Sequence, residues 1–125
     1  MKVLFLIFCG GGAGSVFRYL LINYFSKVMP STIPYGTILV NLLGALIIGM
    51  IYFFLSTRLL LNEQFKIFFT IGFLGGFTTF STFNLDFFKL IESGNFGLAI
   101  IYTAITFIGT VTLFYLGFHI VKVIS

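Results

Sequence analysis

Residues 72–83, GFLGGFTTFSTF, combine three kinds of group that can handle ions without carrying charge. Glycine and β-branched threonine are poor helix formers, so the segment is able to free backbone carbonyls, which hold small monovalent cations in membrane proteins. Ser81 and Thr82 add hydroxyl donors, which suit an anion. Phe80 and Phe83, three residues apart, offer ring edges, the positive part of the aromatic quadrupole, although such a stripe is also typical of core packing.

Two other apolar segments carry uncharged polar side chains at helical spacing. Tyr102, Thr106 and Thr110 recur every four residues, and so do Thr37 and Asn41. Each set therefore lies on one helix face. Threonines often bond their own helix, and an intramembrane asparagine often joins two helices. The alternative is a polar track whose hydroxyl and amide groups donate to a passing solute.

Arg18 is a charged residue near the end of the first apolar segment. It lies 16 residues beyond Lys2, or about 24 Å along a helix. One interpretation is an arginine that snorkels to the membrane surface and anchors the helix end. The other is a positive charge that faces an aqueous vestibule and attracts anions.

The composition predicts an integral membrane protein. Of the 125 residues 59% are hydrophobic and 8% are charged, whereas soluble domains are roughly 25% charged. No Asp, Glu, Lys or Arg occurs in 28–57, 67–85 or 93–121, and each stretch is long enough to span a bilayer. We expect an all-α fold, a single domain over 1–125, with four transmembrane helices at about 3–25, 33–56, 66–90 and 95–122.

The third helix is predicted to break at mid-membrane, because Gly75-Gly76 followed by Thr78-Thr79 disfavours a continuous helix. Irregular backbone at that depth is tolerated only inside protein or along a polar cavity. The alternative is a continuous helix with a small-residue packing groove at Gly72-xxx-Gly76.

The basic residues give no clear orientation. The side with both termini is expected to hold four basic residues: Lys2, Arg58, Lys66 and Lys122. The other side holds two basic residues, or three if Arg18 is counted there. Orientation needs a clear Lys/Arg bias, so we expect insertion both ways and an antiparallel homodimer. A modest bias with one fixed orientation is the alternative. The scattered basic residues do not indicate nucleic-acid binding.

An enzyme is not predicted. The chain shows no carboxylate pair and no nucleophile with a matching base, and one His and one Cys do not build a metal site. Asp86, Glu63 and Glu92 are expected at span boundaries. A small dual-topology multidrug exporter coupled to protons would need an acid inside the membrane, so this alternative is disfavoured. A non-transporting scaffold is a further alternative.

Three stretches carry a family resemblance: GGAGSVFRY at 11–19, GTILVNLLGALIIG at 36–49 and GFLGGFTTFSTF at 72–83. Together they resemble the Fluc fluoride channels, the CrcB family. The resemblance implies a passive, fluoride-selective channel that exports fluoride across the bacterial cytoplasmic membrane and confers fluoride resistance. It also implies a dual-topology antiparallel homodimer with two pores.

The resemblance also implies roles for single residues. Ring edges of Phe80 and Phe83 line the fluoride path, and Arg18 belongs to the vestibule. The backbone carbonyls of Gly75 and Thr78, from both subunits, hold a structural sodium ion on the dimer axis. The remaining pore residues are polar: Thr37, Asn41, Ser81, Thr82, Tyr102, Thr106 and Thr110.

Overall fold

The computed structural model describes residues 1–57 and 62–125, and within these ranges all regular structure is helical. Arg58, one of the basic residues in the charge comparison, lies outside the described residues. Three helices are long: α1 (Lys2–Val28), α2 (Tyr35–Ser56) and α6 (Phe96–Ile124). The third segment consists of four pieces: α3 (Glu63–Lys66), the π-helix η1 (Ile67–Leu74), α4 (Gly75–Phe77) and α5 (Phe80–Glu92).

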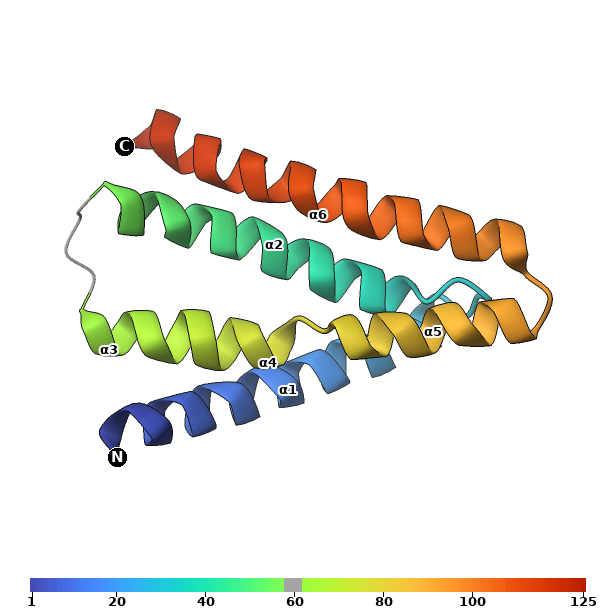
Figure 1. Cartoon of the computed structure of the whole chain (residues 1–125), viewed down its shortest axis with the longest axis horizontal. Coiled ribbons are helices and arrows are strands. Elements are labelled where there is room, and N and C mark those ends of the chain that lie inside the picture. Colours follow the sequence, from blue (N-terminus) through green and yellow to red (C-terminus); the bar gives the residue numbers. More distant parts are fainter. Residues whose placement is uncertain (58–61) are drawn as a thin grey trace.

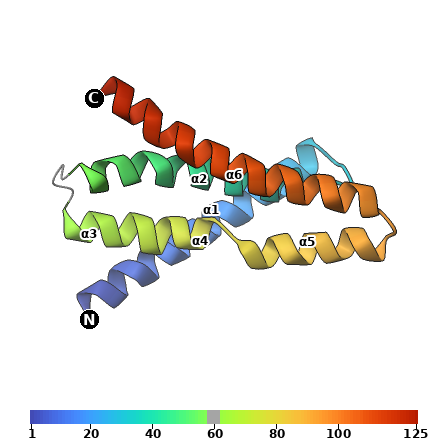
Figure 2. The same ribbon diagram turned by 45° about the horizontal axis from the view of Figure 1, so that its top comes forward.

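The four segments form an elongated bundle with both termini at one end (Figure 1). α2 packs along α6, and α1 packs against η1 and α4. The view in Figure 2 shows α1 crossing the third segment near α4. α1, α2 and α6 are each long and apolar enough to cross a membrane. The prediction of an all-helical membrane protein with four helical segments is confirmed.

The predicted break in the third segment is present, and it lies at the threonines of the predicted stretch rather than at its glycines. Thr78 (φ −85°, ψ 152°) and Thr79 (φ −152°, ψ 125°) are extended, whereas Gly75 (φ −62°, ψ −38°) is helical and Gly76 lies within α4. Local bonds of the threonine hydroxyls to the backbone contribute to this departure from the helix. The Thr79 hydroxyl accepts from the Thr82 N–H at 3.1 Å, which makes Thr79 the N-cap of α5.

The glycines instead allow α1 and the third segment to approach closely. A Cβ atom on Gly72 would lie 3.0 Å from the Gly10 Cα, and one on Gly76 would overlap the Gly11 carbonyl. Close backbone approach at small residues is a main source of helix association in membranes. The packing groove and the break, which the sequence offered as alternatives, therefore occur together.

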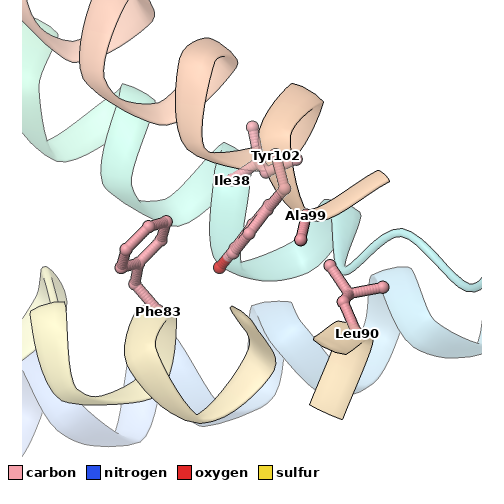
Figure 3. Close-up of a cluster of buried hydrophobic side chains, with 5 residues drawn as sticks. All are labelled: Ile38, Phe83, Leu90, Ala99 and Tyr102. Atoms are coloured by element: carbon pink, nitrogen blue, oxygen red, sulfur yellow. The ribbon is translucent and has the colours of Figure 1, made fainter. Parts of the chain in front are cut away.

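A buried cluster holds α5 against α2 and α6. Its buried members are Ile38, Phe83, Leu90, Ala99 and Tyr102 (Figure 3). A tight turn between α5 and α6 brings these helices together, and Gly94 in that turn has φ 79°, a conformation that favours glycine. Because Tyr102 and Phe83 belong to both this cluster and the predicted pore, packing fixes two of the candidate site residues.

Candidate functional site

An open cleft of about 440 Å³ lies beside the break in the third segment. α2, the third segment and α6 all contribute to its wall. Seven of the predicted site residues line it: Asn41, Gly75, Thr78, Phe80, Phe83, Thr106 and Thr110. Its other lining residues in the described part of the chain are also uncharged. The cleft therefore offers polar groups to a solute without offering a countercharge.

Asn41 stabilises the broken backbone from α2. Its Oδ1 accepts from the Thr79 N–H at 2.8 Å, and its Nδ2 donates to the Thr79 carbonyl at 3.1 Å. A buried backbone group without a partner is costly, so these two bonds offset the loss of helical bonds at the break. The predicted interhelical role of Asn41 is thus seen directly. The second Nδ2 hydrogen is not used in this pair, and Asn41 also lines the cleft.

The Gly75 and Thr78 carbonyls lose their helical donors at the break. In a continuous helix they would accept from the N–H groups four residues ahead, those of Thr79 and Thr82. The Thr79 N–H donates to Asn41 instead, and the Thr82 N–H donates to the Thr79 hydroxyl. Both carbonyl residues line the cleft. The arrangement fits the predicted coordination of a small monovalent cation by backbone carbonyls.

The hydroxyls of α6 differ in their hydrogen bonds. Thr110 donates to the Thr106 carbonyl at 2.7 Å, the local bond common for threonine in membrane helices. The Thr106 hydroxyl is buried and has no hydrogen-bond partner within the described residues. A buried hydroxyl without a partner is unfavourable unless something else binds it. Thr106 is therefore the cleft-lining residue of α6 whose buried hydroxyl keeps an unused proton.

The two predicted phenylalanines lie side by side in the cleft wall. Phe80 is 63% exposed and Phe83 is 4% exposed. Their rings stack at 5.4 Å, and Phe83 also stacks on Tyr102 at 4.9 Å. Phe107 stands nearly perpendicular to both, at 83° to Phe80 and 86° to Phe83. Stacking occupies ring faces, so ring edges are what Phe83 can present to the cleft.

Thr37 and Tyr102 belong to a second polar cluster, outside the cleft. The Thr37 hydroxyl donates to Asp86 Oδ2 at 2.7 Å, and the Tyr102 hydroxyl donates to the same oxygen at 3.3 Å. Figure 3 shows the Tyr102 hydroxyl directed toward α5, which carries Asp86. Asp86 itself lies within α5, half-buried, because two hydroxyls from α2 and α6 bind its carboxylate. Its expected place at a span boundary stays a prediction.

Arg18, Ser81 and Thr82 form a third group, on the α1 side of the break. The half-buried Arg18 donates through Nε to the Gly76 carbonyl at 3.1 Å and through Nη1 to the Thr82 hydroxyl at 3.2 Å. Ser81 shares a hydroxyl–hydroxyl contact of 3.2 Å with Thr79. The predicted pore residues thus fall into three groups: the first and third lie at the break, and the second adjoins the cleft through the stacking of Tyr102 on Phe83.

Comparison with known proteins assigns the chain to a family. The family model described as "CrcB-like protein, Camphor Resistance (CrcB)" matches residues 5–118. The chain belongs to the CrcB family. Several relatives bear the name fluoride-specific ion channel FluC. One from Leptospira interrogans (strain Fiocruz L1-130) is 39% identical over 97% of this chain and 95% of its own.

Two further relatives with the same name come from distant bacteria. The protein of Phocaeicola vulgatus is 47% identical over 75% of this chain and 77% of its own. The protein of Escherichia fergusonii is 38% identical over 96% of this chain and 94% of its own. The family resemblance stated from the three motifs is confirmed. The roles of single residues in this CrcB-family chain stay predictions.

Sequence reasoning missed two residues that contact the predicted site residues of this CrcB-family chain. Asp86 was set aside because it follows a charge-free stretch, yet it lies one helical turn after Phe83, on the face toward Tyr102. That spacing could have placed it with the pore residues. Phe107 was missed because a phenylalanine in an apolar helix carries no distinguishing signal, although it directly follows Thr106.

Proposed function

We propose that this chain is a passive fluoride-selective channel that exports fluoride from the bacterial cytoplasm across the cytoplasmic membrane. The observation that carries the proposal is the buried Thr106 hydroxyl without a partner in the described residues, in a cleft that also holds Asn41 and Phe83. Uncharged donors and ring edges suit an anion. The specific anion, fluoride, is proposed from the names of relatives that align over nearly the whole chain.

The cleft chemistry supports a small anion over a large organic solute. A hydrogen bond to an ion is about twice as strong as one between neutral groups, and fluoride is the strongest acceptor among the halides. Fluoride is also the halide that is most costly to remove from water, so a site selective for it must supply several well-placed donors. The absence of a charged residue from the described lining of the cleft also leaves no fixed carboxylate to repel the anion there.

The functional unit in this proposal is an antiparallel homodimer with two pores and a structural sodium ion on its axis. The Gly75 and Thr78 carbonyls of one chain supply only part of the coordination shell of a small cation, so a second chain would supply the rest. Gly75 and Phe80 are exposed beside the cleft, where a second copy could cover them. When bound, the cation would lower the electrostatic cost of bringing an anion into the membrane.

A small multidrug exporter is the alternative from a different class. The sequence argument against it is the expectation that no acid lies within a span, and the half-buried Asp86 of α5 is the acid that bears on it. What disfavours it is that Asp86 already accepts from two hydroxyls and does not line the cleft. An exporter of this kind would show proton-coupled uptake of a hydrophobic cation, and a scaffold would show no flux.

The test is efflux from liposomes that contain the purified protein. Vesicles are loaded with fluoride or with chloride, and release is followed with ion-selective electrodes after the membrane potential is clamped. We expect fast fluoride release with chloride retained. Retention of both anions by vesicles that contain folded protein would overturn the channel proposal, and equal release of both would overturn the selectivity.

A further inference from the structure

Arg18 connects the two sides of the helix break. Its Nε donates to the carbonyl of Gly76, which precedes the break, and its Nη1 donates to the hydroxyl of Thr82, which follows it. In a continuous helix the Gly76 carbonyl would accept from the N–H of residue 80. The guanidinium therefore supplies a donor to the end of α4, and with the same fork it reaches the first turn of α5.

The bonds around Thr82 determine which way its hydroxyl proton can point. Thr82 Oγ1 accepts from Arg18 at 3.2 Å and from the Thr79 hydroxyl at 3.2 Å. A hydroxyl has one proton and two acceptor lone pairs. With both lone pairs occupied, the Thr82 hydroxyl can act only as a donor, and no acceptor for it is found within residues 1–57 and 62–125.

The neighbouring hydroxyls do not have this freedom. The proton of Thr79 is used in the bond to Thr82, so the 3.2 Å contact between Thr79 and Ser81 takes its proton from Ser81. The Thr79 oxygen also accepts from the Thr82 N–H at 3.1 Å. Of the three hydroxyls at the start of α5, Thr82 alone keeps a proton to donate.

We propose that Arg18 is a positioning residue: it orients the Thr82 hydroxyl as a donor to fluoride and holds α4 and α5 in register across the break. The inference rests on the proposed function, and it adds a second role to the vestibule role expected for Arg18. The guanidinium keeps its positive charge when it donates to two neutral protein oxygens, so it can still attract an anion while it positions Thr82. Removing it frees a lone pair on Thr82, which would then repel an anion.

Fluoride efflux from liposomes tests the link between the two residues through a double-mutant comparison. Arg18→Gln is measured in three backgrounds: the natural sequence, Thr82→Ser, which keeps the hydroxyl, and Thr82→Val, which removes it. We expect Arg18→Gln to slow efflux about tenfold in the first two backgrounds. In the Thr82→Val background we expect a further change of less than about twofold, because the group that Arg18 orients is gone.

Arg18→Lys separates positioning from charge. It keeps the positive charge but not the planar fork that reaches two oxygens, so we expect efflux well below that of the natural sequence. This comparison also decides the matter if Thr82→Val alone abolishes efflux. Natural efflux in Arg18→Lys, or an equal loss from Arg18→Gln in the Thr82→Ser and Thr82→Val backgrounds, would overturn the inference.

Folding is checked by size-exclusion elution and thermal unfolding of each purified variant, so that a slow channel is distinguished from an unfolded one. Failure of the proposed function has a different signature. In that case the natural sequence itself releases no more fluoride than empty vesicles, and the inference falls with it, since Thr82 would have no anion to receive its proton.

Discussion

The Asn41 side chain bonds both backbone groups of Thr79, accepting from its N–H at 2.8 Å and donating to its carbonyl at 3.1 Å. The amide thus acts as an extra peptide group from α2 at the point where the third segment leaves the helix. A side chain that offers both a donor and an acceptor is required for this pairing. Asn41 consequently links the stability of the break to the chemistry of the cleft that it lines.

Asn41→Asp is expected to abolish fluoride efflux and to lower the thermal stability of the protein. The ionised carboxylate cannot donate to the Thr79 carbonyl, and it places a negative charge beside the anion route. An unsatisfied buried carbonyl costs about 1–3 kcal/mol. Efflux and the unfolding midpoint are measured on the same preparation. Thr57→Val, a substitution outside the cleft, is purified and reconstituted in the same way and serves as the control. Normal efflux in Asn41→Asp would show that Asn41 only joins helices.

The motifs predicted the family, the helical class and the existence of the break, because each depends on residue types within a short stretch. The position of the break depends on contacts from other helices. Thr78 and Thr79 are extended where Asn41 supplies bonds from α2, whereas Gly76 lies within α4 and packs against Gly11 of α1. Propensity disfavours a helix at the glycines and at the threonines alike, so it could not choose between them.

Asp86 shows a second limit of the sequence analysis. Its position after a charge-free stretch predicts a place at the membrane boundary but gives no sign that hydroxyls from Thr37 and Tyr102 bind its carboxylate. The partners of this half-buried acid come from residues distant in sequence, so their arrangement could not be predicted from spacing. The same holds for Thr106, whose missing partner becomes visible only when its surroundings are known.

Phe80→Ile is expected to reduce fluoride efflux at least about tenfold with little loss of stability. Isoleucine keeps the apolar character but lacks the ring edge that the proposal places on the anion route. Because Phe80 is 63% exposed, its truncation leaves no cavity in the described core. Phe88→Ile is the matched control, since Phe88 lies on the same helix, is 58% exposed and does not line the cleft. Equal efflux in the two variants would remove the Phe80 ring from the mechanism.

Gly76→Ala is expected to destabilise the protein by about 1–3 kcal/mol, the usual cost of overpacking. A Cβ at this position would overlap the Gly11 carbonyl of α1. Gly97→Ala is the control: its Cβ would meet nothing within 4 Å, and alanine in a helix gains about 0.5–1 kcal/mol over glycine. Thermal unfolding in detergent compares the two. A similar midpoint in both variants would mean that the close contact between α1 and α4 is not needed for stability.

Thr106→Val is expected to separate function from stability. Valine has nearly the shape of threonine without the hydroxyl, and the Thr106 hydroxyl is buried with no partner in the described residues. Removing it should therefore leave stability unchanged or raise it by up to about 1 kcal/mol. Fluoride efflux should fall about tenfold, because the cleft loses a hydroxyl donor. In the proposal the anion accepts from this hydroxyl and so offsets the cost of burying it.

Thr110→Val is the matched comparison, on the same face of α6 and in the same cleft. Its hydroxyl proton is already donated to the Thr106 carbonyl at 2.7 Å, so the anion route loses no free donor and efflux should change by less than about threefold. A general effect of removing hydroxyls from α6 would slow fluoride efflux equally in the two variants. A larger loss in Thr110→Val than in Thr106→Val would show that the unpartnered hydroxyl does not mark the anion's position.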